Sequence, residues 1–393
     1  MTASNSIRDR LGARVVALVA ALALVLGLAW IALIPDGRGG GSPAGAASGK
    51  PPAAASTTAP VPAAILARRA ARKRYWGAWI GSQLTGEQAP FDMRAVSKFE
   101  RIADKPLSIV HWAYPFADCT SNPCTFIAFP SREVTKVRRH GAIPMVSWSS
   151  AAVPDAPDQR AFQLRDIAAG RYDGYIRSFA RAALAWGNPF FLRFNWEMNG
   201  DWFPWGVRAN RNRARDYVSA WRHVHRIFDR VGARNATWVW CPYVDPDHRF
   251  NLKRLYPGGA FVDWTCLDAY NWGRNPVNST PWRSFGELVR STYRRIARGF
   301  APHKPMMLGE IASSDYGGSK ARWIRHMLRT IPRHYSKIRA VVYYDVEDRN
   351  VGWPIETPRR VRRAFRSGIN QRSYVPNRFR RLHARPIPPP PRR

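Results

Sequence analysis

The sequence is short of acidic residues: 27 Asp and Glu stand against 62 Lys and Arg, which gives a formal net charge of +35. Such an imbalance attracts polyanions, among them nucleic acids, anionic lipids and acidic polymers of the cell envelope. No helix-turn-helix, zinc-finger or RNA-binding signature accompanies the charge, so we expect no nucleic-acid partner. The composition instead indicates a generally basic, soluble surface.

Cysteine is also scarce, with four residues in 393. No Cys-x-x-Cys pair and no closely spaced histidines accompany them, which argues against a zinc site. Cys119 and Cys124 bracket a short loop and are predicted to form a disulfide, as in proteins of an oxidising compartment. Cys241 and Cys266 lie in two apolar runs, where they either pair or remain buried thiols.

Three further patterns are missing. No glycine-rich phosphate loop follows the first predicted strand, which argues against an open doubly wound sheet. No self-similarity recurs at a fixed period, which excludes helical repeats. The serines and histidines form no recognisable nucleophile–base arrangement. The chemistry suggested below needs no organic cofactor and no metal.

Charge is absent from residues 15–34, a stretch of about 20 residues that is long enough to cross a bilayer. Residues 1–14 carry arginines and are predicted to stay in the cytoplasm. The apolar stretch is either an uncleaved transmembrane anchor or a removed signal sequence, with a candidate cleavage site at residues 44–46. Either way, the rest of the chain is expected outside the cytoplasm, anchored to the cell membrane or secreted. Residues 35–72, rich in Pro, Gly and Ala, are expected to form a flexible linker.

Residues 73–369 alternate apolar runs with amphipathic, helix-periodic segments. The runs are nearly uniformly apolar at their starts, as expected of strands buried on both faces. They cover residues 75–81, 107–114, 143–148, 190–196, 237–243, 262–270, 305–311 and 338–344. Eight strand–helix units over about 300 residues predict a (β/α)8 TIM barrel. Residues 370–393 form a basic Pro/Arg-rich tail, predicted to be disordered and to bind an acidic envelope polymer.

The most informative stretch is residues 188–205, which read NPFFLRFNWEMNGDWFPW. Its apolar start predicts the fourth strand. Because alternate residues of a strand point the same way, we expect Arg193, Asn195 and Glu197 to share one face. Polar groups at a strand end beside large rings suit a polyhydroxylated substrate, since sugars offer hydroxyls to polar groups and apolar faces to indole rings.

Two carboxylates, Glu197 and Glu310, end the fourth and seventh apolar runs. The C-terminal ends of barrel strands meet at one mouth, where active sites lie. Glycoside hydrolysis requires two such groups: one protonates the leaving oxygen, and the other attacks the anomeric carbon from about 5–5.5 Å away in retaining enzymes. We therefore predict that this pair is catalytic.

The run WEMNGDWFPW, with Arg193 before it, and the run LGEIA around Glu310 resemble glycoside hydrolase family 26, the family of endo-β-1,4-mannanases. The resemblance covers most of residues 75–369. It implies a retaining (β/α)8 hydrolase in which Glu197 is the acid/base and Glu310 the nucleophile. It also implies that Tyr270 hydrogen-bonds the nucleophile. Residues that would shape the substrate cleft are Arg193, Asn199, Trp202 and Trp205.

One position departs from the family pattern: mannanases of the family usually carry His before the acid/base glutamate, and this chain has Trp196. The departure leaves the polymer open, with β-mannan as first candidate and β-glucan or xylan as alternatives. Two other functions also remain open, a non-catalytic carbohydrate-binding barrel and a transglycosylase. Further strand-end candidates for substrate binding are His111, Trp148, Trp272 and Trp353. For each of them the alternative is a place in the core.

Overall fold

The computed structural model describes residues 72–278 and 280–391. The predicted cytoplasmic segment, the anchor or signal and nearly all of the linker lie outside these residues. Within the described part, no helix is long and apolar enough to cross a membrane.

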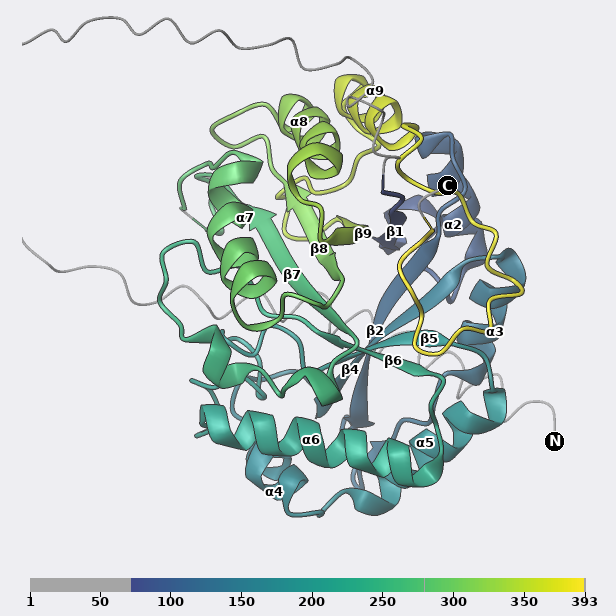
Figure 1. Cartoon of the computed structure of the whole chain (residues 1–393), viewed down its shortest axis with the longest axis vertical. Helices are drawn as coiled ribbons and strands as arrows, with labels where there is room; N and C mark the ends of the chain where they lie inside the picture. The colour runs from purple at the N-terminus through teal and green to yellow at the C-terminus, as the bar shows by residue number, and fades with distance from the viewer. Residues whose placement is uncertain (1–71, 279, 392–393) are drawn as a thin grey trace, which may run out of the picture.

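A closed parallel barrel forms the centre of the molecule, as predicted (Figure 1). Its strands are β1 (Tyr75–Ile80), β2 (Ile109–Asp118), β4 (Ile143–Val153), β5 (Phe190–Phe194), β6 (Ala236–Trp240), β7 (Trp264–Asn271), β8 (Met306–Ser313) and β9 (Ile338–Asp345). Each pairs in parallel with its neighbour, and β1 closes the ring by pairing with both β2 and β9. The two-residue β3 (Thr125–Phe126) adds an antiparallel pairing at the end of β2. All strand residues of β1, β5, β6, β7 and β8 are buried, which explains their uniformly apolar starts.

Helices surround the barrel (Figure 1). They are α2 (Met93–Ala103), α3 (Ser131–His140), α4 (Leu164–Ala168), α5 (Asp173–Trp186), α6 (Ala214–Val231), α7 (Phe285–Arg294), α8 (Lys320–His334) and α9 (Arg359–Ile369). A π-helical segment, η6 (Arg295–Phe300), continues α7, and short 3-10 turns such as η4 (Leu252–Leu255) replace a helix after β6. The helical segment between β4 and β5 is divided into α4 and α5, because Gly170 adopts a left-handed conformation between them.

The C-terminal tail is ordered in the part that the structure describes, so the prediction of disorder is wrong for residues 370–391. It crosses the barrel face where the strands begin. Ile387 is 1% exposed, its N–H donates to Thr237 Oγ1 at 2.9 Å, and its carbonyl accepts from Trp264 Nε1 at 2.8 Å. The carbonyl of Pro388 accepts from Tyr75 Oη at 2.9 Å. Proline has no N–H to leave unpaired, so a proline-rich segment can cover this face at little cost.

Both cysteine pairs are joined. Cys119 bonds to Cys124, the predicted pair, and closes the loop that follows β2. Cys241 bonds to Cys266, which resolves the alternative left open by the sequence and ties the end of β6 to β7.

Removing the buried side chain of the tail should destabilise the barrel. We expect Ile387→Ala to lower the free energy of unfolding by about 2–4 kcal/mol, because a buried aliphatic group is lost at a well-packed site. The exposed tail residue His383 supplies the control, and His383→Ala should change stability by less than about 0.5 kcal/mol. Denaturant unfolding measures both. Equal stability of the two variants would show that the tail does not pack on the barrel in solution.

Candidate active site

The chain turns sharply after β5. The strand ends at Phe194, two residues earlier than predicted, and Asn195 and Glu197 have φ angles of 43° and 52°. These left-handed conformations are costly for residues other than glycine and cluster at functional sites. The side chain of Asn195 holds the turn by accepting from the Ser150 N–H and donating to Ser150 Oγ, both at 2.8 Å. The predicted shared face is therefore wrong, because Glu197 reaches the mouth through a turn rather than through strand alternation.

Glu197 is 5% exposed, and its Oε2 accepts from Trp202 Nε1 at 2.7 Å. Its N–H donates to the carbonyl of Cys241 at 2.7 Å, which anchors the turn on the end of β6. Burial, reinforced by the nearby charge of Glu310, raises the pKa of Glu197 to about 8. A carboxyl group with this pKa holds its proton at neutral pH and can act as a general acid.

Glu310 lies on β8 and is held by two donors. One of its oxygens accepts from Arg193 Nη2, and the other accepts from Tyr270 Oη. A carboxylate bound in this way by a guanidinium and a phenol is held in one orientation. The geometry supports the predicted hydrogen bond from Tyr270.

Arg193 is completely buried and connects the site to the barrel interior. Its Nη1 donates to both oxygens of Asp268 at 2.8 and 2.7 Å, and its Nε donates to Ser147 Oγ at 2.7 Å. Burial alone would lower the pKa of Arg193, but the carboxylates of Asp268 and Glu310 outweigh it and raise that pKa. The guanidinium therefore stays charged, as a buried cation with paired anions should.

Three carboxylates meet at this mouth. Glu197, Asp268 and Glu310 each offer an oxygen, and these oxygens lie within 4.8 Å of one another. One guanidinium cannot neutralise three buried negative charges, so one carboxyl group should be protonated. Glu197 accepts a hydrogen bond from a neutral indole, whereas Asp268 and Glu310 both accept from the guanidinium of Arg193, so Glu197 is the natural holder of that proton.

Asp268, Ser147 and Gly309 are essential parts of this arrangement that the sequence did not single out. Asp268 lies opposite Glu310 in the β7–β8 pairing, just after a bulge. Such a bulge changes the direction in which the following side chains point. A Cβ on Gly309 would lie 2.4 Å from Cys266 Sγ and 2.8 Å from Asp268 Oδ1. The available signals were the two-residue spacing between Asp268 and Tyr270, and the glycine before Glu310 in LGEIA.

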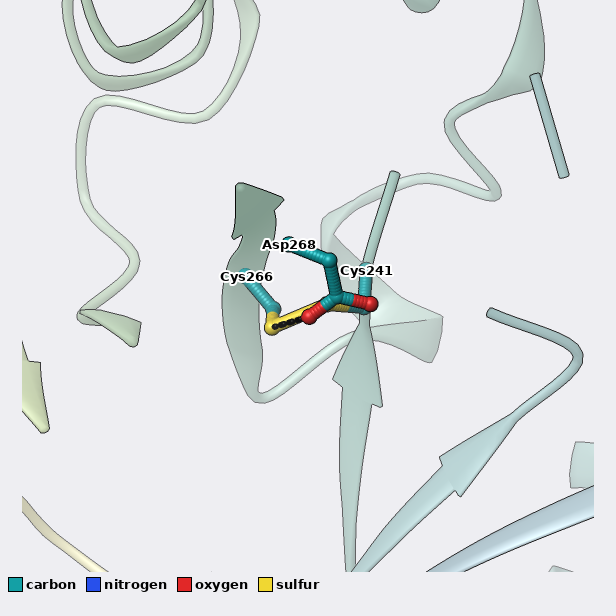
Figure 2. A group of neighbouring side chains, drawn as sticks. All are labelled: Cys241, Cys266 and Asp268. Carbon is teal, nitrogen blue, oxygen red and sulfur yellow. Dashed lines mark hydrogen bonds between the residues drawn. A yellow bond between two sulfur atoms is a disulfide. The ribbon is translucent and has the colours of Figure 1, made fainter. Parts of the chain in front are cut away.

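The second disulfide lies directly beneath the network (Figure 2). Asp268 Oδ1 is 3.2 Å from Cys241 Sγ, a contact rather than a hydrogen bond because the bridged sulfur carries no proton. Among the described residues, two groups have ligand atoms close enough together for a metal ion. One consists of Cys241, Cys266 and Asp268, and the other consists of the three carboxylates. The donor chemistry does not fit either, since the sulfurs are not thiolates and Arg193 occupies both oxygens of Asp268.

Aromatic rings line one side of the carboxylates. Trp202 is half-buried and meets the half-buried Tyr243 edge-on, with centroids 5.4 Å apart. Trp272 donates to Tyr243 Oη at 3.2 Å, and Tyr270 packs against Trp272 with centroids 5.9 Å apart. Asn199 supports this wall from behind by bonding both backbone groups of Tyr243 at 2.9 and 3.0 Å. Substrate contact by Trp202, Tyr270 and Trp272 stays a prediction that this placement favours.

Five other predicted substrate-binding side chains do not reach the surface, and one of them is Arg193, which is held in the ion-pair network described above. Trp148 is wrong as a platform, because its ring stacks 4.1 Å from that of Phe179 on α5, in the layer between strands and helices. Trp205 is 1% exposed and donates to the carbonyl of Trp196. Trp353 is fully buried behind Trp272, with centroids 4.9 Å apart. His111 is fully buried and contacts Ser147 Oγ at 2.6 Å, below Arg193.

Trp196, the departure from the family pattern, packs inward. It is 3% exposed, lies against Trp205 and Phe203, and has the guanidinium of Arg193 4.9 Å from its ring centre. This cation–π contact covers the ion-pair network on the side next to the turn.

Comparison with known proteins agrees with this geometry. Residues 134–300 match the model of glycosyl hydrolase family 26. The chain is also 30% identical over 317 residues to endoglucanase H of Acetivibrio thermocellus, an alignment that covers 76% of this chain. The chain therefore resembles this family, most directly over residues 134–300.

Other proteins are similar over shorter stretches or in fold alone. A mannan endo-1,4-β-mannosidase A and B of Caldalkalibacillus mannanilyticus is 39% identical over 80 residues, 19% of this chain and 15% of that protein. The chain spans only 31% of the length of endoglucanase H. The catalytic domain of a family 26 endo-β-1,4-mannanase from Bacillus sp. JAMB-750 has the same fold, with a TM-score of 0.57 and 17% identity over 79% of this chain and 88% of that one.

The close packing at Gly309 yields a stability prediction. Gly309→Ala should lower the free energy of unfolding by about 1–3 kcal/mol, because the added methyl group collides with Asp268 and the disulfide. Gly299→Ala is the matched control, since a Cβ there meets no atom within 4 Å. Chemical denaturation would measure both variants, and an unchanged stability in Gly309→Ala would contradict the described packing.

Proposed function

We propose that the chain is a retaining endo-β-glycosidase that cleaves a β-linked polysaccharide, with Glu197 as acid/base and Glu310 as nucleophile. The observation that carries the proposal is the spacing of their oxygens, within 4.8 Å, at the mouth of the barrel. Retaining enzymes place the two carboxyl groups about 5–5.5 Å apart, whereas inverting enzymes need about 6.5–9.5 Å to admit a water molecule.

The reaction proceeds by double displacement. An oxygen of Glu310 attacks the anomeric carbon while the bond to the leaving oxygen breaks, and that oxygen takes the proton of Glu197. The products are a glycosyl ester on Glu310 and a Glu197 carboxylate. Glu197 then removes a proton from water, the water attacks the anomeric carbon, and Glu310 is released as a carboxylate. Arg193 and Tyr270 keep Glu310 oriented through both steps.

The names of the relatives guide the choice of polymer. One is an endoglucanase and another a mannan endo-1,4-β-mannosidase, so β-mannan is the first candidate, with β-glucan and xylan as alternatives. Trp196 leaves the alternatives open, because its buried indole has an N–H donor but no acceptor at a position where family mannanases carry His.

We also propose that the barrel works outside the cytoplasm, held by residues 15–34 if they are not removed. The first described residues enter the barrel at the face where the strands begin, since Arg74 bridges to Tyr374 just before β1. This face lies opposite the catalytic mouth. A linker attached there would direct the mouth away from the membrane.

The function is tested by removing each carboxylate. Glu197→Gln and Glu310→Gln should each lower kcat on the preferred polymer by about 10³-fold or more, since each removes an obligatory group. Glu347→Gln is the control, because this exposed carboxylate follows β9 at the mouth and has no place in the mechanism. Reducing-sugar release from mannan, β-glucan and xylan measures all three. Glycan binding without turnover in the unmodified protein would instead favour a carbohydrate-binding barrel.

The raised pKa of Glu197 sets the alkaline limit of activity. Glu197 must be protonated to donate, so kcat/KM should fall as the pH rises through about 8. An aryl glycoside with a strongly acidic leaving group needs no protonation and should show a weaker alkaline fall. Identical profiles for the two kinds of substrate would contradict the assignment of Glu197 as the acid.

A further inference from the structure

Helices α7 and α8 are neighbours on the outer wall of the barrel (Figure 1). A dense row of arginines lies along these two helices and along η6, which continues α7. We call this region the basic groove. It contains seven exposed arginines, namely Arg290, Arg294, Arg298, Arg322, Arg325, Arg329 and Arg333. His326 and His334 lie among them.

The arginines of the basic groove are not paired. No carboxylate of the described residues lies within 4.0 Å of any of these seven guanidinium groups, although ion pairs form elsewhere on the surface, as between Arg177 and Asp173 or Arg360 and Asp315. The one acidic residue of α7 and α8 is Glu287, and its Oε2 accepts from the Ser284 N–H at 2.7 Å to cap α7. Close like charges repel one another, so such a concentration is costly unless a partner neutralises it.

The groove is concave and elongated. Two hollows of about 430 and 330 Å³ adjoin and share His326, Thr330 and His334 as lining residues. Arg290 and Arg294 on α7 and Arg298 on η6 recur every four residues, which spaces them by about 6 Å along the helix axis. Gly286 leaves room for this row, because a Cβ there would lie 3.0 Å from Arg290 Nη2. The shape fits a linear chain with repeating anionic groups.

The lining argues against other anionic partners. Its aromatic residues, Tyr293 and Tyr335, are 6% and 4% exposed, so neither offers a ring on which a nucleic-acid base can stack. The hollows contain no exposed apolar side chain of the described residues that could insert into a bilayer, and a concave surface meets a flat membrane poorly. The tail is a weaker candidate than the groove, because Arg380 and Arg385 donate to backbone carbonyls of the barrel.

We propose that the basic groove binds an anionic polysaccharide, a glycan chain that carries carboxylate or phosphate groups. Guanidinium groups bind both kinds of anion through paired hydrogen bonds. The choice of a glycan over an acidic protein rests on the proposed function of the barrel. The groove is a separate site on the outer wall and does not include the catalytic carboxylates.

The test uses the whole protein with the substitution Glu310→Gln, so that hydrolysis cannot shorten the polymer during the measurement. Calorimetric titrations with polygalacturonate, phosphomannan and neutral mannan should show binding of at least one anionic polymer outside the mouth. The triple variant Arg294→Gln, Arg325→Gln, Arg329→Gln should weaken this binding at least about tenfold. It should also lower the slope of the log binding constant against the log salt concentration by about 2. The matched control removes three exposed arginines from the α5–α6 side, Arg181→Gln, Arg230→Gln and Arg234→Gln, and should change the affinity less than about twofold.

Three results would overturn the proposal. The first is an equal loss in the two triple variants, which would mean diffuse attraction by net charge. The second is the absence of binding to both anionic glycans. The third is tighter, groove-dependent binding of single-stranded DNA or phosphatidylglycerol vesicles than of either glycan. If the unmodified protein binds the anionic glycan in the groove but hydrolyses none of mannan, β-glucan and xylan, the result would count against the proposed function alone.

Discussion

The buried guanidinium of Arg193 is the interaction on which the mouth of the barrel depends. It joins Asp268, Glu310 and Ser147, which come from three different strands, and it is completely shielded from water. Removing it would leave buried carboxylates without a counter-charge, which costs far more than an exposed ion pair contributes. The glycine at position 309, the second disulfide and the indole of Trp196 all pack around it. Because the barrel packs tightly around Arg193, its guanidinium holds Glu310 in one orientation.

The two catalytic candidates are supported in opposite ways. Glu310 extends from a regular strand and accepts hydrogen bonds from a guanidinium and a phenol. Glu197 stands on a left-handed turn, buried beside two other carboxyl groups, with an indole N–H as hydrogen-bond donor. Different environments are what let two chemically similar groups act as a base-like nucleophile and as an acid. The cost of the turn is offset by Asn195 and by the carbonyl of Cys241.

Much of the fold could be predicted from the sequence, because strands buried on both faces leave apolar runs and the helices between them are amphipathic. The pair Glu197 and Glu310 was also predictable, since both follow such runs. The turn after Phe194 was not, because left-handed residues other than glycine have no local signal. Trp148 and Trp353 were misplaced since tryptophans near strand ends serve the core and the mouth equally well. The ordered tail was missed because its many arginines and prolines hide a few buried residues, among them Tyr374 and Ile387.

The most direct test of the account is covalent trapping. The protein would be incubated with activated 2-deoxy-2-fluoro mannosides, glucosides and xylosides, and its peptides analysed by mass spectrometry. The account predicts a glycosyl adduct on the peptide that contains Glu310, absent from Glu310→Ala, and the reacting sugar would identify the preferred polymer. An adduct on Glu197 or Asp268 instead, or inversion of the anomeric configuration during hydrolysis, would contradict it.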